Sequence, residues 1–141
     1  MTGEFVSERA PEPVGAFPHA RRVGDLLFLS GIGPRQRGSK DIPGVTLDDA
    51  GKIVAYDIET QTRTVFDNVR TVLEDAGASW NQIVDVTVFL TDMDDFPRFN
   101  PIYAEYFAGE GKPNPTRTTM EVGRLPTPIA IELKVIAWLG S

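Results

Sequence analysis

Apolar residues recur at helical spacing through the middle of the chain. Between Ile58 and Ala76 they return with the spacing of helical turns and so fall on one face of a helix. Asp57, a residue type that caps helix N-termini, stands just before this run, and Gly77 follows it where a C-cap glycine belongs. The pattern predicts a helix over residues 57–76.

Runs of alternating or continuous apolar residues predict the strands. Residues 83–91 alternate and are rich in β-branched side chains. Two short runs flank Gly24-Asp25, a dipeptide typical of a two-residue hairpin. The second run, Leu26–Leu29, is wholly apolar, as expected of a strand buried on both faces. Further strands are predicted at residues 45–47, 53–56 and 129–138 and at a segment that begins near Arg117, with a proline-marked turn at 125–128 before the last strand.

Three other segments carry weaker patterns. Asn100-Pro101 has the signature of an N-cap followed by proline at the first helical position, which predicts a short helix over residues 100–107. Residues 31–51 hold five glycines and form a long loop, which is either part of a functional site or a mobile surface insertion. Residues 1–13 are polar, contain two prolines, and are expected to form a loose N-terminal arm.

The order of elements is strand-strand, helix, strand, helix, strand-strand. It predicts an α/β (α+β) fold in which two helices pack on one face of a mixed β-sheet. The 141 residues are the size of a single domain. The other face of the sheet would need a cover, and a second subunit is the natural one for so small a chain.

Charge and composition argue against several classes of function. The net charge of −6 disfavours nucleic acids and anionic membranes as partners. Because the chain has no cysteine, thiolate and disulfide chemistry are excluded. His19 is the only histidine and no acidic cluster has the spacing of a calcium loop, so no metal is expected. No apolar run approaches the roughly 20 residues of a membrane span, and the N-terminus lacks the apolar core of a signal peptide, so a cytoplasmic protein is expected.

Arg117 and Glu132 are the main candidates for chemistry. An arginine at the start of a strand, after a proline-containing loop, can present a bidentate fork to a carboxylate; the alternative is a weak surface salt bridge. Glu132 interrupts an apolar strand. It lies either on the solvated face of an edge strand or, under a neighbouring subunit, as a partly buried acid suited to activating water. The turn between the last two strands predicts that the pair lies on adjoining strands.

Other polar residues can complete a pocket. Ser30 ends an apolar strand and can hydrogen-bond a ligand. Phe17 and His19 can form a pocket wall, although a lone histidine is more often a structural hydrogen-bonder. The spacing of a nucleophile elbow or of a phosphate loop is missing from the sequence. A basic set can hold a second anionic group or simply be solvated: Arg21, Arg22, Arg35, Arg37, Lys40 and Arg124.

A series of short segments occurs in a recognisable order: Gly15–Phe17, Leu29–Gly31, Asp67–Val69, Val86–Leu90, Asn100–Phe107, Pro115–Thr118, Leu125-Pro126 and Ile131-Glu132. With them the chain, from about Pro13 onward, resembles the Rid (YjgF-type) family of reactive-intermediate deaminases. The resemblance implies a chorismate-mutase-like subunit and a homotrimer with active sites between subunits. It also implies hydrolysis of imines and enamines to ketones and ammonia without a cofactor.

The resemblance assigns roles by position. It implies that Arg117 binds the substrate carboxylate and that Glu132 positions and activates the attacking water. Ser30 and Asn100 match pocket positions of the family, although Asn100 is also explained as a helix cap.

Within the family, the chain looks most like the 2-aminomuconate deaminases. Phe17 stands where many other members have tyrosine, and Thr119 where many have cysteine. The FPH, DIxxQTR and PTRTT segments and the long 31–51 loop point the same way. The expected substrate is then 2-aminomuconate, a small dicarboxylate enamine, converted to 2-oxohex-3-enedioate (4-oxalocrotonate) during breakdown of aromatic compounds; its second carboxylate would give His19 and the loop arginines a role. The alternatives are a general 2-iminobutanoate/2-iminopropanoate deaminase and a non-enzymatic, ligand-binding member.

Overall fold

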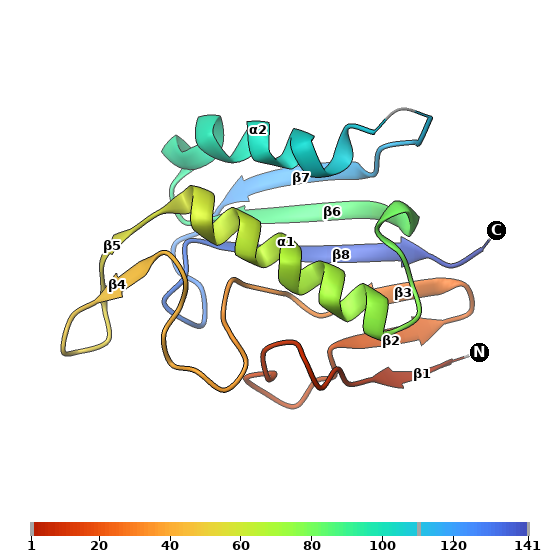
Figure 1. The fold of residues 1–141 in the computed structure, drawn as a ribbon, viewed down its shortest axis with the longest axis horizontal. Coiled ribbons are helices and arrows are strands. Elements are labelled where there is room, and N and C mark those ends of the chain that lie inside the picture. The colour runs from red at the N-terminus through yellow and green to blue at the C-terminus, as the bar shows by residue number, and fades with distance from the viewer. Residues whose placement is uncertain (1, 110, 141) are drawn as a thin grey trace.

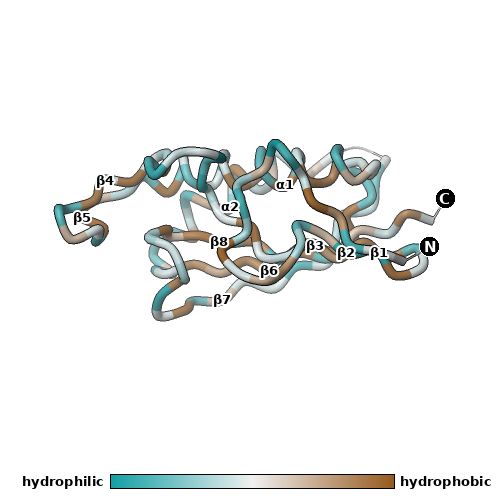
Figure 2. The backbone as a smooth tube through the Cα atoms, turned by 90° about the horizontal axis from the view of Figure 1, so that it is seen from below, coloured by the Kyte–Doolittle hydropathy of each residue, from teal (hydrophilic) through white to brown (hydrophobic). Residues whose placement is uncertain are grey.

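The computed structural model describes residues 2–109 and 111–140. These residues form a six-stranded mixed sheet in the order β1-β2-β3-β8-β6-β7, and helices α1 and α2 cover one of its faces (Figure 1, Figure 2). A hairpin of β4 and β5 projects beyond the sheet. The predicted mixed α+β fold with helices on one face is confirmed. The elements are β1 (Thr2–Phe5), β2 (Ala20–Val23), β3 (Leu26–Leu29), β4 (Val45–Leu47), β5 (Ile53–Tyr56), α1 (Ile58–Asp75), η1 (Trp80–Gln82), β6 (Ile83–Leu90), η2 (Met93–Asp95), α2 (Phe96–Phe107), β7 (Thr116–Glu121) and β8 (Ile131–Trp138).

Helix α1 forms as predicted because its ends and its inner face are encoded locally. The Asp57 carboxylate accepts a hydrogen bond from the Glu59 backbone N–H at 3.3 Å and caps the N-terminus. Gly77, with φ at +81°, turns the chain after the last helical turn, in a conformation that suits glycine. The inner face is buried against the sheet, with Phe66 and Leu73 fully enclosed.

Helix α2 begins at Phe96 and not at Asn100, so the predicted start is wrong. Asp95 occupies the N-cap position, and Pro97 lies in the first turn, where a missing N–H has no intrahelical partner to lose. The helix continues through Pro101, which gives up only one further hydrogen bond. Asn100 therefore belongs to the helix body, and its side chain is available for the site described below.

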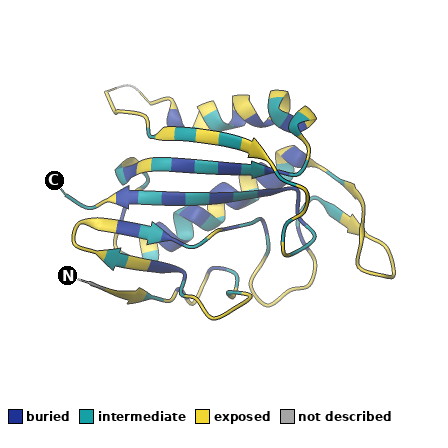
Figure 3. Cartoon of the chain, turned by 180° about the vertical axis from the view of Figure 1, so that it is seen from behind, coloured by how far each residue is buried: buried dark blue, intermediate teal, exposed yellow. Residues whose placement is uncertain are grey.

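Strand β8 lies in the middle of the sheet, between β3 and β6, rather than beside β7. β6 pairs antiparallel with β8 and parallel with β7. The prediction that Arg117 and Glu132 lie on adjoining strands is therefore wrong, as is the alternative of an edge strand for Glu132. Burial explains the order: Ile131 and Leu133 are fully buried and suit a central strand, whereas the threonine-rich β7 is largely exposed and suits an edge (Figure 3).

The sheet face away from the helices is half-exposed and partly apolar. Along β6 and β8 buried residues alternate with half-exposed ones (Figure 3). Phe28, Phe89 and Ile136 lie on the half-exposed face. On β3, Leu27 and Leu29 are buried while their neighbours are not, which corrects the prediction of burial on both faces. The reason is that the helices cover only one side of the sheet.

The N-terminal segment is not a loose arm. Thr2–Phe5 forms β1, which pairs antiparallel with β2 at the edge of the sheet, and Ser7 is buried. A polar composition did not reveal this strand because its backbone partners, Ala20–Val23, lie in another segment and strand formation depends on that context. Met1, the first residue of the expected arm, lies outside the described residues.

The predicted strands at 45–47 and 53–56 form a hairpin of their own within and after the long loop. Tyr56 ties this hairpin to the start of α2, because its hydroxyl donates to Asp95 Oδ2 at 2.6 Å. Burial, together with this carboxylate, raises the pKa of Tyr56 to about 12. The β4-β5 hairpin, which continues the long loop, is thus held against the start of α2.

Candidate functional site

A cavity of about 180 Å³ opens where the N-terminal segment meets the ends of β3 and β8. Its walls come from residues 10–19, from residues 30–35 after β3, and from the loop before β8. Most of the lining is apolar. Four of the predicted site residues lie in it together: Phe17, His19, Ser30 and Glu132.

Glu132 places a half-buried carboxylate in this cavity. It projects from β8 on the side opposite Ile131 and Leu133, which are buried under the helices. Burial raises the pKa of Glu132 above the usual glutamate range, and the positive charge of Arg35 opposes part of that rise. A carboxyl group with a raised pKa can take a proton from water and return it closer to neutral pH than an ordinary glutamate can.

The backbone after β3 makes room for this carboxylate. A Cβ atom added to Gly31 would stand 2.6 Å from Glu132 Oε2, closer than real side chains approach. Ile32 then rejoins the sheet by exchanging backbone hydrogen bonds with Leu133, at 2.8 and 2.9 Å. Any larger residue at position 31 would therefore push the flexible end of the Glu132 side chain away from this place.

Ser30 and His19 hold the cavity wall together. The Ser30 hydroxyl donates to the Pro18 carbonyl at 2.7 Å, which leaves its oxygen lone pairs for a ligand. His19 is buried, and its Nδ1 accepts a hydrogen bond from the Ser7 N–H at 2.9 Å. Its Nε2 lies 2.7 Å from the Pro11 carbonyl and must carry the proton, because Nδ1 is the acceptor. Both ring nitrogens of His19 therefore bond to backbone groups, as expected of a structural hydrogen-bonding histidine.

Arg117 lies on β7 and turns toward α2. Its Nη1 donates to Asn100 Oδ1 at 2.8 Å. The guanidinium carbon lies 4.5 Å from the centre of the Tyr103 ring, within range of a cation–π contact. Among the described residues the ion pairs do not include Arg117, so a surface salt bridge does not account for it. Its remaining N–H groups can bind a carboxylate.

Two unpartnered hydroxyls accompany this arginine. Thr119 stands two positions along β7 and so faces the same way as Arg117. The Thr119 Oγ1 and the Tyr103 hydroxyl are buried, and neither has a hydrogen-bond partner within the described part of the chain. Burial raises the pKa of Tyr103, and Arg117 opposes that rise. Buried hydroxyls without partners are costly, which favours a polar ligand or water at this place.

The predicted site residues therefore form two groups. The cavity group consists of Phe17, His19, Ser30 and Glu132, and the β7 group consists of Arg117, Asn100 and Thr119. In the sheet register, Arg117 pairs with Val86 and Glu132 pairs with Phe89. Because positions three apart on a strand point to opposite faces, Arg117 and Glu132 leave opposite faces of the sheet. The cavity group and the β7 group of a single chain therefore cannot bind the same small ligand.

Acidic residues elsewhere serve structural contacts. Asp75 pairs with Arg9, and Asp95 pairs with Arg98. Across residues 2–109 and 111–140, no three or more His, Cys, Asp or Glu side chains gather as a possible metal-binding group. Neither α1 nor α2 is both long and apolar enough to cross a bilayer.

Nearly the whole chain matches known proteins. A family model described as Endoribonuclease L-PSP matches residues 7–139. The chain belongs to the Rid (YjgF, RutC, L-PSP) family. It is 41% identical over 132 residues to a RutC family protein of Pyrococcus abyssi, which covers 94% of this chain and 93% of that protein. It is 36% identical to the Reactive Intermediate Deaminase A, chloroplastic, of Arabidopsis thaliana, over 96% of this chain and 66% of that protein.

Solved structures show the same Rid architecture. The crystal structure of Escherichia coli TdcF with bound serine has a TM-score of 0.81 and 29% sequence identity, over 96% of this chain and 98% of that one. The Rid family, which the series of short sequence segments predicted, is therefore confirmed by both the sequence and the fold.

Two residues of this Rid chain, Gly31 and Tyr103, have site roles that were not predicted, and a third, Arg35, was predicted only as one member of a basic set. Gly31 admits the Glu132 carboxylate, a close approach that no sequence pattern reveals. The ring of Tyr103 packs against the Arg117 guanidinium. Tyr103 lies three residues after Asn100 on one helix, and this spacing could have predicted that the two side chains share a face. Arg35 lines the cavity, but nothing in the sequence separates it from the other arginines of its loop.

Proposed function

We propose that the protein is a cofactor-independent hydrolase that deaminates imines and enamines of carboxylic acids. The observation that carries the proposal is the half-buried carboxyl of Glu132, with its raised pKa, in an apolar cavity. Arg117, oriented by Asn100, retains donors for a substrate carboxylate. Two relatives support this: the Arabidopsis protein is named a reactive intermediate deaminase, and TdcF holds serine, which carries a carboxylate.

In the proposed reaction, Arg117 anchors the substrate and Glu132 moves protons. Glu132 takes a proton from water as the water oxygen bonds to the imine carbon, and it returns the proton to nitrogen to give a carbinolamine. A second transfer, from the carbinolamine hydroxyl through Glu132 to nitrogen, releases ammonia and leaves the ketone. An enamine first tautomerises to the imine, gaining a proton at carbon from water and losing one from nitrogen to water. Because an imine carbon is already electrophilic, orientation and one proton carrier supply most of the acceleration.

A second copy of the chain is proposed to complete the site. Arg117 and Glu132 leave opposite faces of one sheet, so a ligand held by both must lie between two chains. Head-to-tail contact, with the β7 group of one copy against the cavity group of the next, gives a ring when its rotation closes. We propose a homotrimer, as the family resemblance implies. The half-exposed apolar face around Phe28 and Ile136 offers area for such contacts.

The preferred substrate is proposed to be 2-aminomuconate, which would yield 2-oxohex-3-enedioate and ammonia. Phe17 lies at the cavity wall and is 41% exposed, so its ring is available to a ligand. Thr119 adds an unpartnered hydroxyl beside the carboxylate anchor. These are the two positions that differ from common residues of the family, and they favour a substrate larger and more polar than the smallest imino acids.

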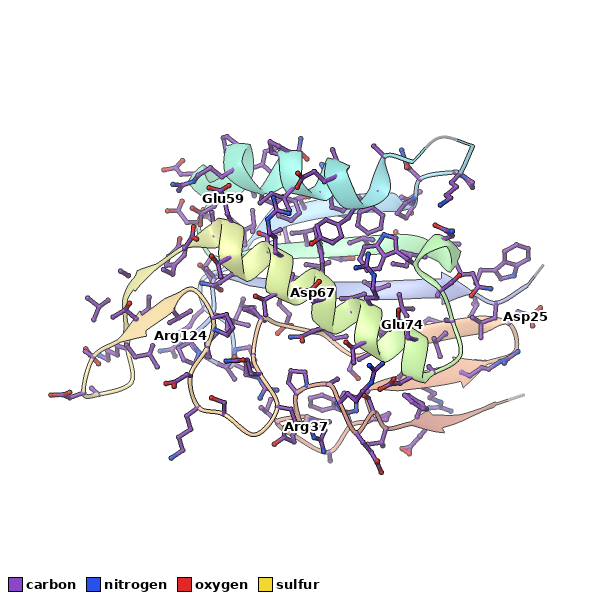
Figure 4. The ribbon with its side chains drawn as sticks, in the orientation of Figure 1. Asp25, Arg37, Glu59, Asp67, Glu74 and Arg124 are labelled. Atoms are coloured by element: carbon purple, nitrogen blue, oxygen red, sulfur yellow. The ribbon has the colours of Figure 1, made fainter. Side chains whose placement is uncertain are left out.

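RNA cleavage, the activity named in the family description, fits the charge of this chain poorly. The net charge is −6. Glu59, Asp67 and Glu74 lie exposed along the outer side of α1 (Figure 4). A phosphate backbone is bound by clustered cations, whereas on this side of the helix the acids outnumber the exposed Arg63, which is paired with Glu105.

The proposal is tested by measuring ammonia release from 2-aminomuconate and from 2-iminobutanoate with the whole protein. We expect both to react and 2-aminomuconate to have the higher kcat/KM. A higher kcat/KM for 2-iminobutanoate would reject the substrate but keep the deaminase. Ammonia release from neither, or cleavage of single-stranded RNA at comparable protein concentration, would reject the proposed function.

A further inference from the structure

Arg35 is a cation of the cavity that the proposed reaction does not use. It is half-buried and lines the cavity together with Glu132. Its Nη2 donates to the Glu12 carbonyl at 2.6 Å. In the described part of the chain, the ion pairs do not include Arg35. A guanidinium carries five N–H donors, so several remain for another acceptor.

The loop that carries Arg35 is held on both sides. The Asn68 amide of α1 donates to the carbonyls of Gly33 and Arg35, at 2.8 Å each. On the other side, Ile32 is bonded to Leu133 of β8 through both backbone groups. The backbone of residue 35 is therefore fixed between a helix and the central strand, and binding to its side chain would cost little further ordering of the loop.

The surroundings of Arg35 favour an anion. Val14, Phe17 and Ile129 are among the apolar residues of the lining. Glu132 is the acid in that lining, and Glu12 lies just outside it. The charge of Arg35 acts on both carboxylates without reaching an ion-pair contact. A guanidinium that is partly removed from water and lacks an ionic partner gains most from a carboxylate, which it can bind with two parallel hydrogen bonds.

We propose that Arg35 binds the distal carboxylate of a dicarboxylate ligand and makes the cavity selective for dicarboxylates. The inference rests on the proposed function for the reacting end of the ligand, which Arg117 of a neighbouring copy would hold. The cavity of about 180 Å³ equals roughly six waters at ~30 Å³ each. That is room for a short carbon chain that ends in a carboxylate.

The test compares two acids that share a carbon chain and differ by one carboxylate. Hexa-2,4-dienedioate and hexa-2,4-dienoate are titrated calorimetrically into the whole protein and into Arg35→Gln. We expect the wild type to bind the dicarboxylate at least about 10-fold more tightly. Arg35→Gln should weaken dicarboxylate binding about 10- to 100-fold, the range for a lost hydrogen bond to a charged group, and should leave monocarboxylate binding nearly unchanged.

Lys40→Gln is the matched control, because it removes one positive charge from the same loop at an exposed position outside the cavity lining. It should change neither affinity. Equal wild-type affinity for the two acids would overturn the proposal. An equal loss of affinity for both acids in Arg35→Gln would also overturn the proposal. Arg35 would then act on Glu132 and the cavity as a whole and not on the second carboxylate. Ammonia release is measured separately: its absence rejects the proposed deaminase, whereas the difference in binding decides the role of Arg35.

Discussion

The chemical role proposed for Glu132 carries a cost in stability. Burial raises its pKa in the folded chain, so the folded state holds this proton more tightly than the unfolded chain does. The contribution of the group to stability is fully present below the unfolded pKa and is lost as the pH rises through the folded pKa. Above the folded pKa the ionised carboxylate is therefore unfavourable for folding, a common property of residues kept for activity.

Glu132→Gln is expected to separate these two effects. Ammonia release should fall about 10²- to 10⁴-fold, the usual contribution of a positioned acid-base group. The Tm of the variant should exceed that of the wild type near pH ~8 and approach it near pH ~4, where the native carboxyl is protonated. Kinetics and thermal unfolding at both pH values check this. Full retention of activity would remove Glu132 from the mechanism.

Arg117→Lys keeps the positive charge but loses the planar fork. The ammonium cannot bind a carboxylate with two parallel hydrogen bonds while also meeting Asn100. We expect kcat/KM to fall about 10- to 100-fold, equivalent to about 1.5–3 kcal/mol of transition-state binding. Arg63→Lys is the control, because Arg63 pairs with Glu105 at the surface, where such pairs contribute little. Equal kcat/KM in both variants would exclude the role of Arg117.

At the scale of elements, the N-terminal segment forms one wall of the cavity and is held by a set of contacts that we call the clasp. The Ser7 hydroxyl donates to Asp75 Oδ2 at 2.7 Å, and Arg9 pairs with the same carboxylate. Arg37 Nη1 donates to the carbonyls of Ser7 and Ala10, at 3.2 and 2.8 Å. The clasp joins β1, the cavity wall and the end of α1.

Ser7→Ala should loosen the clasp. The hydroxyl also accepts hydrogen bonds from the N–H groups of Arg9 and Ala10, and Ala10 is buried, so its N–H would be left unpaired. We expect the free energy of unfolding to fall by about 1–3 kcal/mol in urea titrations. Ser39→Ala, on an exposed loop, should change it by less than about 0.5 kcal/mol. A loss no greater than this control would mean that the clasp does not stabilise the fold.

At the scale of the whole molecule, the site is divided between two surfaces. The cavity group and the β7 group face different ways, so each copy would supply half of two different sites. The same arrangement would bring the half-exposed sheet face under a neighbouring chain. Activity and assembly would then depend on each other.

Mixing two inactive variants tests this division directly. Arg117→Ala retains an intact cavity group, and Glu132→Gln retains an intact β7 group. After the two are unfolded together and refolded in equal amounts, random assortment should make about one site in four complete, so about a quarter of wild-type ammonia release should return. Each variant refolded alone is the control. If the mixture stays as inactive as the single variants, the site does not lie between copies.

Much of the fold could be predicted from local patterns. Helix α1, the β2-β3 hairpin and strand β6 lie where periodicity, the Asp57 cap and Gly24-Asp25 predicted them, because these signals act within a few residues. The start of α2 was misjudged because Asn100-Pro101 resembles a helix start, whereas the helix begins one turn earlier with Pro97 in its first turn. The strand at Thr2–Phe5 has no signal in its own residues, because pairing with the distant segment Ala20–Val23 stabilises it.

The sequence by itself predicted most of the local elements and excluded thiol chemistry. It also singled out Arg117 and Glu132 as candidates for binding a carboxylate and activating water. Only the tertiary structure decided that β8 is central, that β6 separates it from β7, and that Arg117 and Glu132 leave opposite faces. The physical reason is that strand order depends on which strands bury the most apolar surface together, a comparison made across the whole chain. Single segments do not contain that information.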